Sequence, residues 1–412
     1  MNGAREKINL LEYLLVMMLI FVSGNPVFCN LPVFPFFQLV FLFVALLFRR
    51  LHFHPKMWLF VISMSVVFFG QYVILGEISI LGCLNRLLKI FFGTAVFALM
   101  KEKFRYAYLD VMAVIAAISI VCFTMQVLDI PIPLKFFSFR SPRFFTSLIY
   151  NYVIEHHGKL RNAGCFWEPG AYACYLMLIP VLFMDSWQKI VRDCPVRCGL
   201  VFVALLTTFS TTGYITLIVC IALGIIANSK RKYLVALTIV PLVAFGSYKM
   251  YNTLDFLGTK VESQTDDLER ETERNEFSNT RFGSLLFDLH YIRKHPVFGN
   301  GMIEKTRYAD NKELWGVELG HGNGFSNFLA QMGIPIMILY FVLMYRLSPF
   351  SRYQRFSNII ILLCLMQGEQ LFNYPLIISF PFVIINEAFL QERFRREKME
   401  RSRRYLYRSL RG

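Results

Sequence analysis

RFGSLLFDLHYIRKHPVFGNGM (residues 281–302) and HGNGFSNFLAQMG (residues 321–333) close the longest polar segment of a very apolar chain. Basic side chains, glycines and a histidine are concentrated here, directly before a hydrophobic helix. Almost everything on either side has the composition of membrane-spanning segments. We therefore expect the chemistry of the protein at residues 281–333. The rest of the chain must indicate which chemistry this is and on which side of the membrane it takes place.

The composition is that of a polytopic membrane protein. Of the 412 residues, 56% are hydrophobic and only 17% are charged, whereas soluble domains have about 45–50% and about 25%. The net charge of +15 would suggest nucleic acid in a soluble protein, but Lys and Arg in cytoplasmic loops explain it better here. Membrane lipids, and not nucleic acid, are the expected partner. The cysteines form no zinc-site pattern, so no metal is expected, and a disulfide between Cys29 and Cys165 is left open.

Twelve apolar segments approach the length of about 20 residues that a membrane-spanning helix needs. The sequence therefore predicts an all-α, polytopic membrane protein with about twelve transmembrane helices. The expected spans are residues 8–23, 31–48, 57–75, 78–100, 106–128, 167–186, 197–210, 212–228, 233–250, 323–345, 357–371 and 374–391.

Basic residues follow every even-numbered span, as the positive-inside rule requires of cytoplasmic loops. Both termini are then cytoplasmic, and two long loops lie on the outer side. Loops of this length are more often functional than connecting. The expected organisation is a membrane domain with the first nine helices and an outer loop at 129–166 (1–250), a large helical outer loop (251–322), the last three helices (323–391) and a basic cytoplasmic tail (392–412).

The segment RNAGCFWEPGAYA, residues 161–173, ends the first outer loop and enters the sixth span. Arg161 stands on the outer side, where orientation needs no positive charge, and a guanidinium is suited to bidentate binding of phosphate. Glu168 and Pro169 have the pattern of a helix start, because proline suits the first turn and a carboxylate suits the positive end of the helix dipole. Glu168 is thus equally well explained by substrate binding and by a structural role.

The large outer loop supplies further candidates. Arg281 begins an expected interfacial helix at 282–292, and Arg293 beyond its end either binds substrate or extends to the membrane surface. His321 precedes the tenth span and is the type of side chain that accepts a proton near neutral pH. Asn323 makes the following helix start polar, and a helix N-terminus is a natural anion site.

Polar residues also occur inside apolar stretches. Arg86 and Lys89 are three residues apart in the fourth span and hence on one helix face, where they either line a groove for lipid phosphates or extend to the membrane surface. The turn STTG at 210–213 and the segment QGEQLFNYP at 367–375 are expected to line a cavity. Glu369 in the second segment is either functional within the membrane or part of a turn just clear of it.

The order of these motifs resembles that of the O-antigen ligase/polymerase superfamily, the Wzy- and WaaL-like membrane glycosyltransferases. The resemblance rests on RNAGCFWEPG, the STTG turn, the large outer loop, HPVFGNG and the pattern H-x-N-x-x-x-N-x-L that begins at His321. It covers residues 161–345, and the twelve-span plan extends it over the chain.

The resemblance implies a metal-independent GT-C-type glycosyltransferase of the bacterial inner membrane that needs no cofactor. Such an enzyme takes glycan from an undecaprenyl pyrophosphate carrier at the periplasmic face, where an acceptor hydroxyl attacks the anomeric carbon. By resemblance, Arg161 and Arg281 stabilise the leaving pyrophosphate, His321 orients or deprotonates the acceptor, and Arg293 is a second clamp. Glu168 matches the family's EPG position, to which we assign no role.

The function expected first is polymerisation of undecaprenyl-pyrophosphate-linked oligosaccharide repeat units into O-antigen or into capsular or exopolysaccharide, with a chain-length regulator protein as a further partner. An O-antigen ligase, which transfers glycan to lipid A core, is the first alternative. A flippase for the lipid-linked oligosaccharide is the second. The chain has no internal repeat of the kind common in transporters, and it has the large outer loop instead.

Overall fold

A computed structural model describes residues 7–29, 34–49, 53–139, 141–153, 160–228, 281–315 and 322–383, with the single residues 51 and 241. Over these ranges the protein is mostly helical. The α-helices are α1 (Leu10–Gly24), α2 (Pro26–Cys29), α3 (Phe34–Arg49), α4 (Pro55–Leu75), α5 (Ile80–Met100), α6 (Lys103–Val127), α7 (Pro169–Leu182), α8 (Trp187–Asp193), α9 (Pro195–Thr207), α10 (Thr211–Asn228), α13 (Arg281–Lys294), α14 (Glu304–Arg307), α15 (Gly324–Met332), α16 (Ile334–Leu347), α17 (Arg352–Met366) and α18 (Pro375–Ile378). The 3-10 turns are η1 (Lys312–Leu314), η2 (Leu371–Asn373) and η3 (Phe380–Phe382), and the strands are β1 (Phe137–Phe139), β2 (Ser141–Thr146) and β3 (Asn151–Val153).

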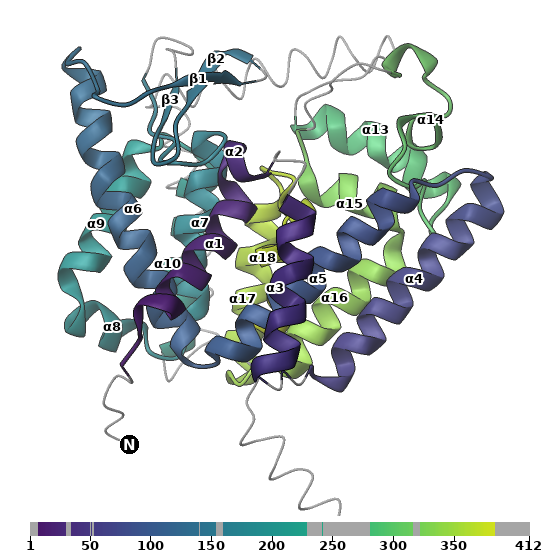
Figure 1. Ribbon diagram of the computed structural model, residues 1–412, viewed down its shortest axis with the longest axis horizontal. Coiled ribbons are helices and arrows are strands. Elements are labelled where there is room, and N and C mark those ends of the chain that lie inside the picture. Colours follow the sequence, from purple (N-terminus) through teal and green to yellow (C-terminus); the bar gives the residue numbers. More distant parts are fainter. Residues whose placement is uncertain are drawn as a thin grey trace, which may run out of the picture.

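The long helices run between two ends of the molecule. Figure 1 shows the strands, α13 and α14 gathered at one end, which we call the loop end. The chain enters α1 from the opposite end. Cys29, in α2 at the loop end, and Cys165 are both free thiols.

Three helices, α4, α5 and α6, are long and apolar enough to cross a membrane, and they confirm the helices expected at 57–75, 78–100 and 106–128. Two further pairs meet the same criterion only as bent units, α7 with α8 at 107° and α15 with α16 at 117°. The described ranges thus hold up to five spanning segments by length and composition. The total of twelve transmembrane helices stays a prediction. The expected span 233–250 lies outside the described residues, except for residue 241.

The expected tenth span, 323–345, is not a single helix. It breaks at Gly333, whose φ of +80° lies in the left-handed region. A Cβ at this position would lie 2.1 Å from the Val297 carbonyl oxygen, so only glycine fits. The Ile334 amide donates to the Pro296 carbonyl oxygen (2.8 Å). The turn HPVFGNG therefore packs into the break and sets the angle between α15 and α16.

A small antiparallel sheet lies within the expected outer loop 129–166 and corrects the all-α expectation. Its strand order is β1-β2-β3. Gln126, near the end of α6, holds the sheet because its Nε2 donates to the Val153 carbonyl oxygen (2.8 Å) and its Oε1 accepts from the Tyr150 hydroxyl (2.7 Å). Aromatic residues favour strands, and residues 136–152 are rich in them. The sequence reasoning overlooked this signal.

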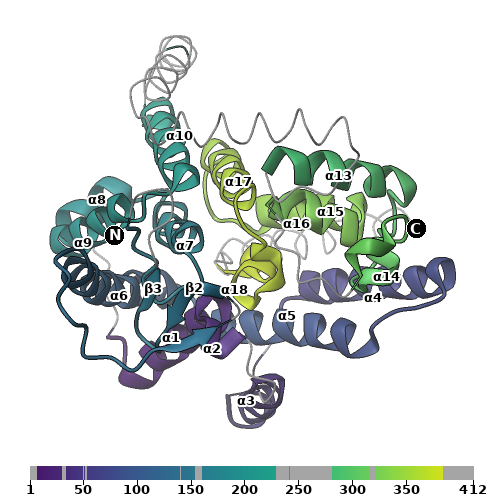
Figure 2. The ribbon, with the colours of Figure 1, turned by 90° about the horizontal axis from the view of Figure 1, so that it is seen from above.

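Two short segments form the centre of the fold. Every residue of α7 is buried, and this helix packs against α6, α9, α10 and α17. In Figure 2, α18 lies between α5, α7 and α17. The Tyr340 hydroxyl of α16 donates to the Ile377 carbonyl oxygen (2.6 Å), and a Cβ on Gly93 of α5 would lie 2.6 Å from the Pro375 carbonyl oxygen. The expected span 374–391 thus begins as a short helix and a turn rather than as one long helix, and residues 384–391 lie outside the described ranges.

Candidate functional site

The loop Gln367–Gln370, which follows α17, is where the polar elements of the loop end meet. Its Glu369 is only 7% exposed. The amide Nδ2 of Asn323 donates to Gln367 Oε1 (2.7 Å). A Cβ on Gly324 would lie 1.8 Å from the Glu369 carbonyl oxygen, so glycine is required at the first residue of α15. The segment QGEQLFNYP and the start of α15, both singled out in the sequence, are therefore one structural unit.

Glu369 pairs with Glu168 at the start of α7. Glu168 precedes Pro169 as expected of a helix start, but its side chain makes no capping hydrogen bond. A Cβ on Gly170 would lie 2.5 Å from Glu369 Oε1 and 3.2 Å from Glu168 Oε1, so both carboxyl groups lie over this glycine. Trp167 Nε1 donates to Glu369 Oε2 (3.3 Å). The position of Glu168 is therefore explained by its contact with Glu369 and not by helix capping.

Two carboxyl groups this close cannot both ionise easily. Burial and the adjacent Glu168 carboxyl raise the pKa of Glu369, and the Arg281 charge and the Trp167 hydrogen bond partly oppose this shift. Glu369 lies in the loop after α17, outside the helices that meet the spanning criterion. The pKa of Glu369 is therefore raised both by burial and by a close carboxyl neighbour.

Arg161 and Arg281 flank the carboxyl pair. Arg161 is half-buried and its Nε donates to the Thr208 carbonyl oxygen (3.1 Å). Burial lowers the pKa of the Arg161 guanidinium, Glu168 and Glu369 counteract this, and Arg281 adds to it. The four side chains thus act on one another electrostatically, and we call them the Arg–Glu cluster. Two guanidinium groups lie beside a carboxyl pair of which Glu369 has a raised pKa, and guanidinium groups suit an anionic ligand.

The backbone that carries Arg161 is fixed on both sides. The Asn162 amide donates to the Thr207 carbonyl oxygen (3.0 Å), and the Asn151 amide of β3 donates to the Gly164 carbonyl oxygen (2.6 Å). Gly164 has a φ of +56°, which glycine adopts without strain. Arg161 is therefore held between the end of α9 and the small sheet, a rigid support that a recognition arginine requires.

The STTG turn lies against the same loop. A Cβ on Gly368 would lie 2.8 Å from Thr212 Oγ1. Within the described chain, the buried hydroxyls of Thr211, Thr212 and Thr216 have no hydrogen-bond partner. Buried hydroxyls are normally paired, so this turn contributes free polar atoms to the surroundings of the Arg–Glu cluster.

Arg86 and Lys89 reach the other end of the segment QGEQLFNYP. Arg86 Nη2 donates to Asn373 Oδ1 (2.6 Å) and to Gln331 Oε1 (3.3 Å), and Lys89 Nζ donates to the Asn373 carbonyl oxygen (2.8 Å). Arg86 is only 8% exposed. The two cations share a helix face as expected, but that face is directed at protein groups of η2 and α15. The Nη1 atom of Arg86 remains without a partner among the described residues.

The remaining predicted residues lie at different places. Asn323 is the N-cap of α15 and accepts from the Ser326 amide (3.1 Å), so its side chain is fully used within the fold. Arg293 is exposed near the far end of α13, about 18 Å along the helix axis from Arg281, and so does not join the Arg–Glu cluster. His321 lies outside the described residues. Its neighbour Gly322 donates its amide to Ser284 Oγ on the first turn of α13 (3.0 Å).

A buried ion pair was missed by the sequence reasoning. Arg307 of α14 and Asp288 of α13 form a salt bridge and are 2% and 0% exposed in their side chains. Ser326 of α15 donates to the other carboxylate oxygen of Asp288 (2.5 Å). The leucine face of α13, by contrast, is partly exposed, with Leu286 at 48%. The pair thus fixes α13 and α15, the helices that carry Arg281 and Asn323.

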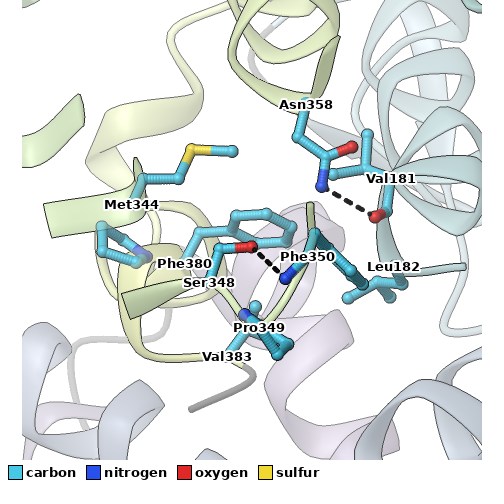
Figure 3. A pocket seen from close by; sticks show the side chains of 10 residues that line it. Val181, Leu182, Met344, Ser348, Pro349, Phe350, Asn358, Phe380 and Val383 are labelled. Atoms are coloured by element: carbon cyan, nitrogen blue, oxygen red, sulfur yellow. Dashed lines mark hydrogen bonds between the residues drawn. The ribbon is translucent and has the colours of Figure 1, made fainter. Parts of the chain in front are cut away.

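The pocket drawn in Figure 3 belongs to the opposite end of the molecule. It lies among the C-terminal ends of α7 and α16 and the start of α17, and Asn358 Nδ2 donates there to the Val181 carbonyl oxygen (3.2 Å). Its volume of about 20 Å³ has room for about one water molecule, which needs about 10–15 Å³ of such volume. This pocket is therefore too small for a glycan or a lipid headgroup and is not a candidate site. The described residues also contain no group of three or more His, Cys, Asp or Glu side chains suited to a metal ion.

Part of the chain is similar to a known protein family. Residues 198–341 match the family model described as O-Antigen ligase. The matched region contains Arg281, the buried Asp288–Arg307 pair and the start of α15, whereas Arg161, Glu168 and Glu369 lie outside it. No curated protein and no solved structure matches the chain.

Proposed function

From the match of residues 198–341 to the O-antigen ligase family model, which supports the O-antigen ligase/polymerase superfamily, we propose that the chain polymerises undecaprenyl-pyrophosphate-linked oligosaccharide repeat units. Family and apolar helices together make it a multi-pass membrane protein that transfers lipid-linked glycan. In the proposal the membrane is the bacterial inner membrane, the loop end faces the periplasm and both termini are cytoplasmic. The basic residues after every even-numbered span support this orientation.

The Arg–Glu cluster is the observation on which the proposal rests. Its two arginines come from different parts of the chain, Arg161 before α7 and Arg281 at the start of α13, and both interact electrostatically with the buried Glu369, which lies beside Glu168. The raised pKa of Glu369 reduces the negative charge that opposes the two guanidinium groups. A pyrophosphate is an anion that two guanidinium groups can bind through several hydrogen bonds.

The proposed reaction requires no metal. A hydroxyl oxygen of the acceptor forms a bond to the anomeric carbon of the donor glycan, and the bond from that carbon to the pyrophosphate oxygen breaks. The pyrophosphate takes the electron pair, and Arg161 and Arg281 stabilise its developing charge. The proton of the acceptor hydroxyl passes to His321 as a general base. Arg86 and Lys89 contribute by holding η2, and with it the loop that carries Glu369.

A ligase is the second candidate, because the matching family model is itself described as O-Antigen ligase. The reacting centre would be the same in both enzymes, and only the acceptor differs. In a polymerase the acceptor is another carrier-linked unit, and in a ligase it is lipid A core.

The test is genetic complementation of a strain that lacks the gene. Arg161→Ala and Arg281→Ala should each abolish long-chain polysaccharide while the protein still reaches the membrane. Arg192→Ala is the matched control, because this side chain is 80% exposed on α8. Membrane amounts are compared by immunoblot and chain lengths by gel electrophoresis.

The same gels separate the two candidates. If the enzyme is a polymerase, loss of activity leaves single repeat units attached to the acceptor, because their attachment needs no polymerisation. If it is a ligase, no repeat unit is attached at all and lipid-linked polymer accumulates. Normal chain lengths in both arginine variants would refute glycan transfer at this cluster.

A further inference from the structure

A cavity of about 330 Å³ lies at the loop end, between the end of α6 and the sheet. This volume falls in the range of small-molecule pockets, about 300–1,000 Å³. Three aromatic side chains line it, Phe136, Phe145 and Tyr152. Phe145 and Tyr152 are directly opposed on neighbouring strands, and the Phe136 and Tyr152 rings meet edge to face at 6.0 Å. Opposed residues share one face of a sheet, so the aromatic groups form one continuous wall.

Asp129 is the charged group of this cavity, and its position is unfavourable for the fold. It follows α6 with a φ of +55°. The Asp129 amide donates to the Gln126 carbonyl oxygen (3.3 Å) and the Ile130 amide to the Met125 carbonyl oxygen (2.8 Å). This is the Schellman pattern, in which glycine or asparagine is preferred at the residue that Asp129 occupies. A carboxylate there also faces the negative end of the helix dipole. Helix stability therefore does not explain an aspartate at this position.

Aromatic rings beside a carboxylate are suited to a sugar residue. A pyranose presents a flat face of C–H groups that packs on an aromatic ring, and its hydroxyl groups donate to carboxylate oxygens. A lipid chain would use the aromatic wall but would leave the exposed Asp129 carboxylate against hydrocarbon, which is costly. A phosphate would be repelled by that charge. The chemistry of the lining therefore selects a neutral, polyhydroxylated ligand.

The sheet that lines the cavity is joined to the segment that carries Arg161. Strand β3, which carries Tyr152, is hydrogen-bonded through Asn151 to Gly164, in the segment that begins with Arg161. Tyr152, Leu160 and Phe209 pack against the same buried residues, Cys122, Phe123 and Tyr150. Leu160 directly precedes Arg161, and Phe209 follows Thr208, the hydrogen-bond partner of Arg161. A glycan with its reducing end at the cluster could thus extend along the sheet.

We propose that the cavity lined by Asp129, Phe136 and Tyr152 is a carbohydrate-binding subsite, which holds a sugar residue of the glycan away from the reacting bond. The subsite deepens the proposed function, on which its role in glycan transfer rests. It explains why an aspartate is placed at the end of α6 and why a sheet is built into an otherwise helical protein.

Binding is tested without turnover, on the full chain in nanodiscs. The probe is the oligosaccharide released by mild acid from the lipid-linked pool of the producing cells, observed by saturation-transfer NMR. Asp129→Asn and Phe136→Leu should each weaken binding roughly tenfold, as expected for loss of one hydrogen bond to a charged group or one ring contact. Asp193→Asn on α8 and Phe356→Leu on α17 are matched controls on exposed residues and should leave binding unchanged.

Thermal unfolding of the same samples separates binding from structure. Asp129→Asn places a favoured residue at the end of α6, so it should keep or raise the unfolding temperature while it weakens binding. Equal binding by wild type and both cavity variants, or signals from lipid only, would overturn the subsite. So would a fall in unfolding temperature that accounts for the lost binding. Because the probe carries no pyrophosphate, a wild type that binds it but forms no polymer refutes the proposed function and not the subsite.

Discussion

Two groups of buried charges lie at the loop end, and they differ in balance. Arg307 and Asp288 are one cation and one anion, both almost without exposure, and Ser326 occupies the second oxygen of the carboxylate. In the Arg–Glu cluster, two arginines act on two neighbouring carboxyls, and the pKa of one of these, Glu369, is raised. The first group is neutral and its anion is satisfied within the fold. The second keeps a positive charge that the fold does not cancel.

The difference indicates which group is structural and which is functional. A balanced pair in the interior stabilises a particular arrangement of helices and carries no net charge that would attract an ionic ligand, although Nε and Nη1 of Arg307 have no partner among the described residues. A cluster with surplus charge costs stability, and proteins retain such clusters where a ligand supplies the missing charge. Substitutions in the first group should therefore act on stability and substitutions in the second on activity.

The largest effect is expected from Asp288→Ala. It leaves Arg307 buried without its carboxylate, which costs about 3–5 kcal/mol in the free energy of unfolding. Unfolding of the protein in nanodiscs or mild detergent measures this loss. Asp185→Ala is the control, because Arg105–Asp185 is a more exposed pair between α6 and the turn after α7 and should change the free energy of unfolding by about 1 kcal/mol or less. Similar losses in both variants would contradict the assignment of Asp288–Arg307 as the structural pair.

The next effect concerns Arg161 and Arg281 and falls on the rate. Loss of one donor to a developing anion lowers the rate about 10²–10³-fold, or roughly 2.7–4 kcal/mol. If both arginines bind one pyrophosphate, the double variant Arg161→Ala, Arg281→Ala should lose much less than the product of the single losses. Transfer rates with purified protein and lipid-linked donor provide the measurement. Fully multiplicative losses would mean that the arginines do not act as one cluster.

Local patterns in the sequence predicted the helices α4, α5, α6 and α13 and the helix start at Pro169, whereas the roles given to Arg161 and Arg281 stay predictions. Apolar stretches and proline positions are local signals, and they survive in the fold because a membrane helix satisfies its own backbone. Glu369 was noticed as an acid within an apolar stretch, but its partner Glu168 could not be identified. The two residues are 201 positions apart, and nothing local to either indicates the contact.

Other features depend on long-range packing and were missed for that reason. The break at Gly333 requires the Val297 carbonyl oxygen from another segment. Asp288 and its salt bridge lie on the buried side of α13, whereas the leucines of this helix predicted a different buried face. The sheet at 137–153 was overlooked because its aromatic residues were taken as part of a loop. In each case the deciding contact is between elements, which hydrophobic periodicity does not encode.

A smaller effect tests the proton that separates the two groups of charges. The raised pKa of Glu369 means that the folded protein binds a proton that the unfolded chain releases above its ordinary pKa of 4.5. The stability of the wild type should therefore fall as the pH rises above 4.5, by up to about 1.4 kcal/mol per pH unit until the folded pKa is passed. In Glu369→Gln this carboxyl no longer titrates. The free energy of unfolding of the variant, compared with that of the wild type, should therefore rise between about pH 5 and pH 7.

The control for this prediction is Glu77→Gln, the same substitution on an exposed residue after α4. A constant difference between Glu369→Gln and wild type would show that the fold does not raise the pKa of Glu369. The Arg–Glu cluster would then be as balanced as Asp288–Arg307, and the argument from surplus charge would fail.

The smallest effect is expected at a third group of charges, on the surface. Asp310 accepts from Lys294 Nζ (2.7 Å) and forms a hydrogen bond with His290 Nε2 (2.8 Å). The hydrogen bonds from Lys294 and His290 lower the pKa of Asp310, so this contribution is present above pH 3.8 and is lost as the pH falls through the folded pKa. Because these side chains are about 40–60% exposed, Asp310→Asn should cost about 1 kcal/mol or less. The loss should shrink further in 1 M salt, where exposed charges are screened, whereas that of Asp288→Ala should persist. If the loss of stability in Asp310→Asn did not depend on salt, exposure to solvent would not distinguish the surface group at Asp310 from the buried pair Asp288–Arg307. The comparison of buried and exposed charges would then fail.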